Sequence, residues 1–352
     1  MRLSEVNINR SIEGICGAGL DISTIVRHPG RNTATSGKLL DGRSFFAKQI
    51  YGSGSKDRYD RSILGSNLTA GIATPRLIGS DDTSKILVFE WIEDTGTKFS
   101  QVERIFDREW LIGALHIVGE IHSIDLSTGE IVDFISPNPD VTAHISAETY
   151  SEATAGELEV YQILHSDSLM QQELQALRND EKESREGNVF IHGDLRVDQF
   201  VGTTDGLQIV DLEESRRGDP ARDLGSLLGD YLHRILINIP SRELSSCRAL
   251  SEEITDADVI EAGVKALERE SIAIRDGISI YAKTRRDFYL SHDFLDRSFR
   301  FSGWHMYDRA FAIAQSSNAI PAPYLAAAGI GRSLIASPGL LVNEVMGEVL
   351  GS

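Results

Sequence analysis

Acidic residues follow two short apolar segments in the middle of the chain. Asp194 comes directly after "NVFIHG" (residues 188–193), and Asp211 follows "LQIV" (207–210), 17 residues further on. Both apolar segments are typical of short strands, and two strand-end carboxylates of one hairpin can point into one cleft. One of them could accept a proton from an attacking hydroxyl while the other holds a divalent metal. The pattern indicates phosphoryl transfer, which needs a positioned base, a metal and cations.

Three further polar side chains complete this predicted set. Gln199 offers a neutral amide oxygen as another metal ligand, and Arg196 can offset the charge of a transferring phosphoryl group. Lys48 lies on a predicted strand, "RSFFAKQI" (43–50), after a hairpin, where it could pair with phosphates. Alternation along this strand predicts two faces, one with Phe46 and Lys48 and the other with Phe45, Ala47 and Gln49. A purely structural polar network is the alternative, which we disfavour because burying several unpaired charges is costly.

The sequence pattern of the first 95 residues predicts a β-rich lobe that would present Lys48. Strand-like sequence runs from Ser23 to Ile50, and Asp41-Gly42 is a strong hairpin signal. Residues 56–70 predict a short helix, and residues 75–94 predict two strands joined by a polar turn.

Helical patterns dominate the remainder of the chain. An apolar face at helical spacing predicts a helix that ends near His122. Residues 139–188 are predicted to be helical and hold eleven Asp or Glu against three Lys or Arg, which favours a solvated face over a cation-binding rim. From Arg222 onward nearly everything is helix-like. The outline is an N-lobe of residues 1–95 and a C-lobe of residues 96–352.

Composition excludes several classes of protein. The 352 residues carry a formal net charge of −18, which repels nucleic acid and anionic lipid. The two cysteines, Cys16 and Cys247, are far apart, so neither a disulfide framework nor a zinc site is indicated. No apolar run resembles a signal peptide or is long enough to span a bilayer. We therefore expect a cytoplasmic protein with no nucleic-acid and no membrane partner.

These motifs resemble those of a known family of kinases. "HGDLRVDQ" (192–199) is similar to the His-Gly-Asp-x-x-x-x-Asn motif of the aminoglycoside phosphotransferase and choline kinase-like branch of the protein-kinase fold. "IVDLEESRRGDPARDLG" (209–225) resembles its Ile-Asp-Trp and Gly-Asp-Pro-x-x-Asp-Leu motifs, and "FFAK" (45–48) resembles its lysine strand. The resemblance implies an α+β, protein-kinase-like fold with a small β-rich N-lobe and a large, mainly helical C-lobe. It also implies ATP and Mg²⁺ as cofactors.

The resemblance also implies a role for each matching residue. Asp194 corresponds to the catalytic base, Asp211 to the principal Mg²⁺ ligand and Gln199 to the second metal ligand. Lys48 corresponds to the residue that contacts the α- and β-phosphates, and Asp223 to one that braces the catalytic loop.

Further positions would surround the nucleotide. "VFEWI" (88–92) matches the hinge whose backbone contacts adenine, which makes Glu90 and Ile92 candidates. Gly30 and Gly37 lie in the segment expected to form the glycine loop. His122 and His305 are interpreted as packed or surface histidines.

Three departures from the family pattern stand out. The family's Asn is Gln199 here, so the metal geometry must shift or one metal must bind weakly. No Glu occurs between Lys48 and Glu90, so the usual helix glutamate is missing; Asp57 or Asp60 could replace it, or the lysine could be ordered only with nucleotide. The glycine loop lacks the protein-kinase spacing.

Three hypotheses describe the acceptor, and we prefer the first over the other two. The first is Ser or Thr of a ribosomally made precursor peptide, ahead of elimination by a partner lyase, because the motifs are similar to stand-alone kinase components of class V lanthipeptide and thioamitide synthetases. The second is a small cationic molecule of the aminoglycoside kind, which the acidic segment favours. The third is a non-catalytic nucleotide-binding scaffold. Arg196 argues against the scaffold, because a degenerate site has no physical reason to keep a cation beside the base.

Overall fold

The computed structural model describes residues 5–93, 108–126, 144–184, 189–239, 256–286, 288–339 and 342–343. The chain divides into two compact units. The first comprises Met1–Ser100, Ile124–Val132 and Asp198–Arg216. The second comprises Gln101–Ser123, Asp133–Val197 and Arg217–Ser352.

The first unit is built on an antiparallel sheet of five strands in the order β1-β2-β3-β5-β4. The strands are β1 (Leu20–His28), β2 (Thr33–Leu39), β3 (Ser44–Gln49), β4 (Leu77–Asp81) and β5 (Ile86–Glu90). The predicted Asp41-Gly42 hairpin joins β2 to β3, and Gly42 has the positive φ of 90° that such a tight turn requires.

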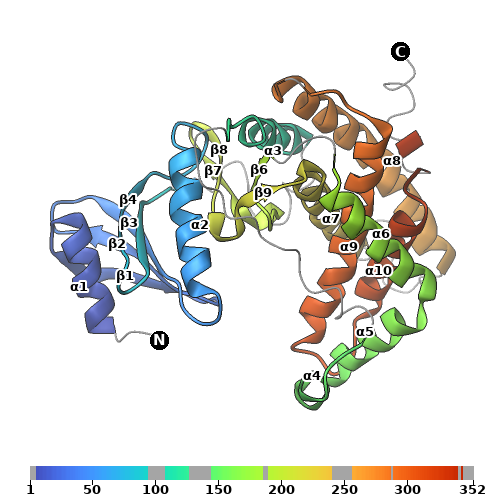
Figure 1. Ribbon diagram of the computed structural model, residues 1–352, viewed down its shortest axis with the longest axis horizontal. Coiled ribbons are helices and arrows are strands. Elements are labelled where there is room, and N and C mark those ends of the chain that lie inside the picture. Colours follow the sequence, from blue (N-terminus) through green and yellow to red (C-terminus); the bar gives the residue numbers. More distant parts are fainter. Residues whose placement is uncertain are drawn as a thin grey trace, which may run out of the picture. The chain divides into compact units, whose positions relative to one another are not determined.

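The two faces of this sheet carry different helices, as alternation along β3 predicts. Phe45, Ala47 and Gln49 are all buried, and Phe45 and Ala47 share a core with Ile8 and Ile12 of helix α1 (Glu5–Cys16). Phe46 and Lys48 belong to the opposite face, where helix α2 (Ser55–Leu68) packs Tyr59 against Ile50 and Leu87. Figure 1 shows α1 and α2 on either side of the sheet. The sheet thus presents Lys48 on its α2 side.

A later segment of the chain completes the first unit. β7 (Phe200–Thr203) and β8 (Gly206–Ile209) form a hairpin, and the Ile209 amide donates to the Ala73 carbonyl at 2.8 Å. The 3-10 helix η3 (Leu212–Glu214) then packs on α2, where a Cβ on Gly65 would lie 2.6 Å from Ser215 Oγ. These contacts group residues 198–216 with the N-terminal sheet, whereas the predicted boundary at residue 95 assigned them to the C-lobe.

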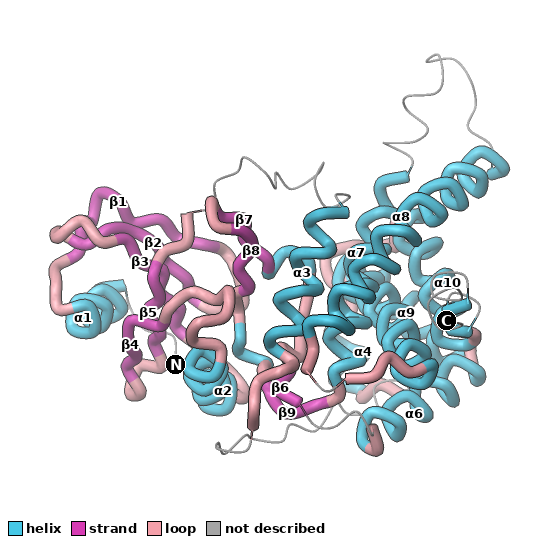
Figure 2. The backbone as a smooth tube through the Cα atoms, turned by 90° about the horizontal axis from the view of Figure 1, so that it is seen from above, coloured by secondary structure: helices cyan, strands magenta, loops and turns pink. Residues whose placement is uncertain are grey.

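The second unit is mainly helical (Figure 2). Its helices are α3 (Arg108–Ile121), α4 (Ala147–Glu152), α5 (Ala155–Ser166), α6 (Ser168–Lys182), α7 (Pro220–Ile239), α8 (Asp256–Thr284), α9 (His292–Ala314) and α10 (Ala322–Ala336). β6 (Val189–Ile191) pairs with β9 (Arg216–Gly218). Helices α7 and α9 approach so closely that a Cβ on Gly229 would lie only 2.6 Å from the Ser302 carbonyl oxygen, so only glycine fits at this position. In the described ranges, no helix has both the length and the apolar character needed to cross a membrane.

The predicted acidic helical segment corresponds to α4, α5 and α6, and several of its acids are paired within the unit. Arg300 of α9 bonds Asp180 at 2.9 Å and Glu173 at 3.0 Å. Further acids contact arginines of α7 and α10, namely Glu181 with Arg222 and Asp167 with Arg332. These four carboxylates hold the helices together, whereas Glu148 and Glu152 of α4 are exposed, as the predicted solvated face requires.

Candidate active site

Lys48 is held by two carboxylates of the first unit. Its Nζ lies 2.6 Å from Asp211 Oδ1 and 3.0 Å from Glu213 Oε2. Neither acid that the sequence suggested as a partner takes this role, because Asp60 bonds Lys56 and Asp57 is exposed. Sequence reasoning missed Glu213, although "LEES" directly follows the predicted metal ligand.

Asp211 has an unusual backbone conformation. Its φ of 69° and ψ of 57° place it in the left-handed region, which residues other than glycine rarely adopt. It stands between β8 and η3, and about a third of its side chain is exposed. Such a conformation persists only where the surroundings enforce it, and it is common at functional sites.

Gln199 lies close to Asp211 through the backbone. It ends the 3-10 helix η2 (Val197–Gln199), its side chain is buried, and its carbonyl accepts from the Val210 amide at 2.9 Å. The described part of the chain contains no group of three or more His, Cys, Asp or Glu that could hold a metal. A carboxylate and an amide nevertheless fit Mg²⁺, which is usually bound through one or two protein oxygens together with substrate phosphates.

Asp194 belongs to the second unit, on the loop after β6. About half of its side chain is exposed, and Arg196 Nη2 lies 3.9 Å from its Oδ2. Partial desolvation raises the pKa of Asp194 above its ordinary value, against the opposing charges of Arg196 and His192. A carboxylate with a raised pKa that still reaches solvent is suited to accept a proton from a hydroxyl.

Asp223 of α7 fixes the first part of this loop. Its carboxylate accepts from the amides of His192 at 2.6 Å and Gly193 at 2.8 Å. His122 Nε2 lies 3.2 Å from the same carboxylate, and His122 Nδ1 lies 2.9 Å from the Tyr281 hydroxyl. Burial opposes ionisation, but the His122 hydrogen bond and these amides hold the pKa of Asp223 below its usual range. The bracing role implied for Asp223 agrees with these contacts, and His122 supports it rather than merely packing.

Asp230 fixes the other end of the loop. It accepts from the Val197 amide at 2.9 Å and from Arg234 Nε at 3.0 Å, and His305 Nε2 lies 3.5 Å away. Asp223 and Asp230 are seven residues apart on α7, which is two helical turns, so both carboxylates point from one face of the helix. That spacing was visible in the sequence but its purpose was not, because the loop they bond lies some 30 residues earlier.

The glycine and hinge candidates have mixed placements. Gly30 lies in the exposed β1–β2 loop, but Gly37 lies within β2, where a Cβ would meet Ile25 Cδ1 at 2.7 Å. Gly37 therefore serves strand packing. Glu90 ends β5, where its amide donates to the Arg76 carbonyl at 2.9 Å and its side chain pairs with Arg76. Ile92 follows it and is half-buried.

An aromatic group that the sequence did not suggest lies on the Lys48 face of the sheet. The His28 ring stacks on Trp91 with centroids 6.4 Å apart and is tilted against Phe46 at 5.7 Å. His28 pairs with Ala34 across the strands and Ala34 pairs with Lys48, so all lie on one face. Flat rings of this kind suit a planar ligand.

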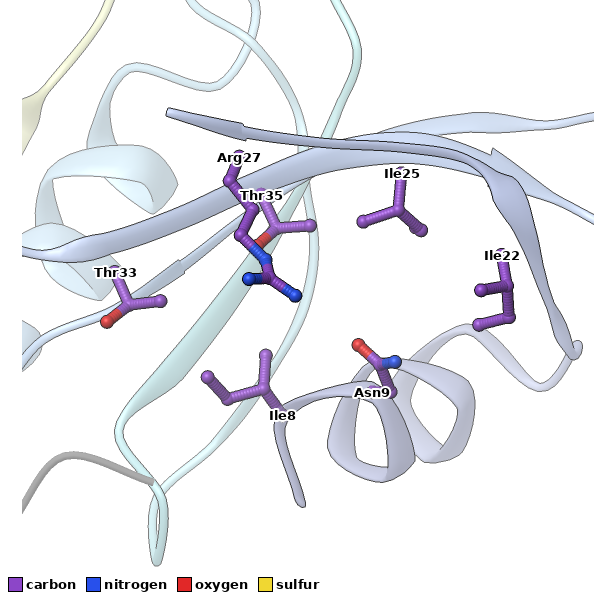
Figure 3. Close-up of a pocket in the computed structure, with 7 residues that line it drawn as sticks. All are labelled: Ile8, Asn9, Ile22, Ile25, Arg27, Thr33 and Thr35. Carbon is purple, nitrogen blue, oxygen red and sulfur yellow. The ribbon is translucent and has the colours of Figure 1, made fainter. Parts of the chain in front are cut away.

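A separate hollow lies on the other face of the sheet (Figure 3). The lining residues come from α1, β1 and β2, and they are Ile8, Asn9, Ile22, Ile25, Arg27, Thr33 and Thr35. Thr35 pairs with Ala47, whose side chain is on the α1 side, so this hollow is not part of the Lys48 group.

Comparisons with known proteins identify the family of the chain. The sequence profile of the phosphotransferase enzyme family matches residues 67–242, half of the chain, so the chain belongs to this family. It is an ATP-dependent phosphotransferase that acts on a hydroxyl group. The predicted family resemblance is thereby confirmed. No curated protein sequence matches the chain significantly.

Solved structures share the protein-kinase-like fold at low sequence identity. Amicoumacin kinase hAmiN, solved with AMP-PNP, Ca²⁺ and Ami, is 10% identical with a TM-score of 0.56, over 96% of this chain and 94% of that one. Choline kinase from Cryptosporidium parvum is 13% identical with a TM-score of 0.52, over 96% and 97%. Aminoglycoside phosphotransferase from Alicyclobacillus acidocaldarius is 12% identical with a TM-score of 0.50, over 100% and 98%. The predicted fold class is confirmed.

Proposed function

We propose that this phosphotransferase moves the γ-phosphoryl group of ATP to a hydroxyl of a small molecule. The observation that carries the proposal is the Asp194 carboxylate, half-exposed and partly desolvated, on a loop bonded at both ends by Asp223 and Asp230. A base held rigidly but open to solvent is what a hydroxyl acceptor requires.

Each residue has a distinct task in this proposal. Asp194 takes the proton of the acceptor hydroxyl while the hydroxyl oxygen forms a bond to the γ-phosphorus and ADP leaves. Arg196, beside Asp194, offsets the charge of the transferring group. Lys48 pairs with the α- and β-phosphates. Asp211 and Gln199 would hold Mg²⁺, which neutralises phosphate charge when it is bound.

The base of the nucleotide has a candidate platform in the same unit. His28, Phe46 and Trp91 present ring faces on the Lys48 side of the sheet. Adenine would stack there, and the backbone of residues 90–92 would supply its polar contacts. Gly30, in the β1–β2 loop, would leave room for the phosphates.

The names of similar structures support this acceptor class. Amicoumacin kinase, choline kinase and aminoglycoside phosphotransferase are each named for a small-molecule acceptor, which supports a small molecule here. The acids of α6 that pair with arginines give no reason to require a positively charged acceptor. The precursor peptide and its partner lyase stay a prediction that rests on sequence resemblance alone. The scaffold alternative is disfavoured because Lys48 has an acidic partner in Glu213.

The test is phosphate transfer from ATP with Mg²⁺ to a panel of amino sugars, amino alcohols and Ser/Thr peptides, followed by mass spectrometry. Asp194→Asn should lower transfer by roughly 10²–10⁴-fold with nucleotide affinity kept, because only the proton acceptor is lost. Asp205→Asn, in the exposed β7–β8 turn, is the matched control. Transfer at the parent rate by Asp194→Asn would remove the base assignment, and transfer to peptides alone would overturn the small-molecule assignment.

A further inference from the structure

We propose that Glu213 is the positioning residue that orients Lys48 for the nucleotide, in place of an acid on helix α2. The inference rests on the proposed function, since Lys48 is given its phosphate-binding task there. Glu213, Lys48 and the residues that contact them all belong to the first unit and are described by the structure.

Helix α2 presents cations, not acids, to the region around Lys48. Its acids are the exposed Asp57 and Asp60, which bonds Lys56 one turn earlier. Its buried charged residues are Arg58 and Arg61, exposed by 3% and 5%. The charge pattern is therefore reversed: the helix supplies arginines and the turn after Asp211 supplies carboxylates.

The Glu213 carboxylate joins three elements of the unit. Its Oε2 lies 3.0 Å from Lys48 Nζ on β3, accepts from Asn32 Nδ2 of the β1–β2 loop at 2.8 Å, and lies 3.6 Å from Arg58 Nη1 on α2. The side chain is largely buried, as are Asn32 and Arg58. A carboxylate with three donors around it in a protected place holds its orientation well.

The backbone that carries Glu213 is itself fixed by α2. Arg61 Nε donates to the Glu213 carbonyl at 2.8 Å, and Arg61 Nη2 bonds Glu214 at 2.9 Å. Gly65 lets the turn approach, because a Cβ there would lie 2.6 Å from Ser215 Oγ. The helix thus acts on Lys48 indirectly, by fixing η3 and through it the Glu213 side chain.

Asp211 cannot orient Lys48 by itself. It is the nearer acid in this structure, but it is more exposed than Glu213 and is the proposed metal ligand. A carboxylate that turns toward a metal no longer restrains the lysine. Glu213 restrains it in either case, because its partners Asn32 and Arg58 do not depend on Asp211.

The experiment is a double-mutant cycle on nucleotide affinity. Binding of ADP without metal would be measured by calorimetry for the parent, Glu213→Gln, Lys48→Ala and the double variant, alongside kcat and KM for ATP. Glu213→Gln should weaken binding by roughly 10–100-fold, the range for a lost hydrogen bond to a charged group. The double variant should bind within about twofold of Lys48→Ala, because Glu213 acts only through the lysine. KM for ATP should rise by more than kcat falls.

Two further variants keep the outcome clear. Asp60→Asn changes an acid of α2 that pairs with the exposed Lys56 and not with Lys48, and it should bind ADP within about twofold of the parent. Glu213→Asp keeps the charge and should recover part of the affinity, which provides a test even where Glu213→Gln folds poorly.

Three results would overturn the inference. One is ADP affinity at the parent level in Glu213→Gln, and another is a double variant whose loss is the product of the single losses, as for two independent structural effects. The third is a Glu213→Asp variant no better than Glu213→Gln. A parent chain that binds no ATP at all would instead refute the proposed function, on which this inference stands.

Discussion

Replacing Asp223 by Asn should separate turnover from nucleotide binding. Asp223 is buried and accepts from two loop amides and His122. Asn keeps one carbonyl oxygen but turns an NH₂ group toward donors, so at least one charge-assisted hydrogen bond of about 1.5–3 kcal/mol is lost. One buried N–H is also left without an acceptor, at about 1–3 kcal/mol. Together we expect about 3–5 kcal/mol of lost stability, comparable to breaking a buried ion pair.

The functional consequence falls on the loop that carries Asp194. A displacement of about 1 Å in a catalytic group can lower kcat by roughly 10²-fold, so kcat should fall by that order in Asp223→Asn. ATP affinity should be kept, because the residues proposed to bind nucleotide belong to the first unit. The assays are urea unfolding followed by circular dichroism, steady-state kinetics and calorimetric ATP binding.

The matched control is Asp180→Asn on α6, a half-exposed acid paired with Arg300. It should change stability by less than about 1 kcal/mol and leave kcat unchanged. The reasoning about Asp223 is refuted if Asp223→Asn keeps the parent kcat and loses no more stability than this control.

Two more predictions concern the charges around the chemistry. Arg196→Ala removes a cation that lowers the pKa of Asp194, so the pKa of Asp194 should rise further. Because Asp194 acts as a base only when it is deprotonated, the acidic limb of the plot of kcat/KM against pH should shift to higher pH. An unchanged acidic limb would contradict the pairing of Arg196 with Asp194. The amide oxygen of Gln199 is one methylene further out than that of an Asn. Turnover of the parent should therefore keep rising as the Mg²⁺ concentration exceeds the ATP concentration, whereas turnover of Gln199→Asn should saturate at a lower Mg²⁺ concentration. Identical Mg²⁺ titrations of the two would remove Gln199 from the metal site.

The order of the elements could be predicted from local patterns. Alternation along residues 44–49 correctly separated Phe45 from Lys48, and Asp41-Gly42 marked the β2–β3 turn. The helix expected at residues 56–70 is α2, Ser55–Leu68. Each of these signals depends on residues within a few positions of one another, which is why sequence alone sufficed.

The partners of the candidate site residues could not be predicted in the same way. Lys48 and Asp211 are 163 positions apart, and no spacing rule identifies Glu213 rather than an α2 aspartate as the further partner. The same holds for His122, which reaches Asp223 from 101 positions away. The place of Gly37 within β2 was missed because a glycine in a polar segment suggests a loop until the strand register is known.

The left-handed backbone of Asp211 has a consequence for how the chain tolerates change. A non-glycine residue in this region costs about 1–2 kcal/mol, so Asp211→Gly would relax the backbone while it removes the carboxylate. Selection for stability alone would therefore favour losing this acid, and a thermostability screen without an activity readout would enrich inactive variants at position 211. Asp211 therefore occupies a backbone conformation that its own side chain disfavours.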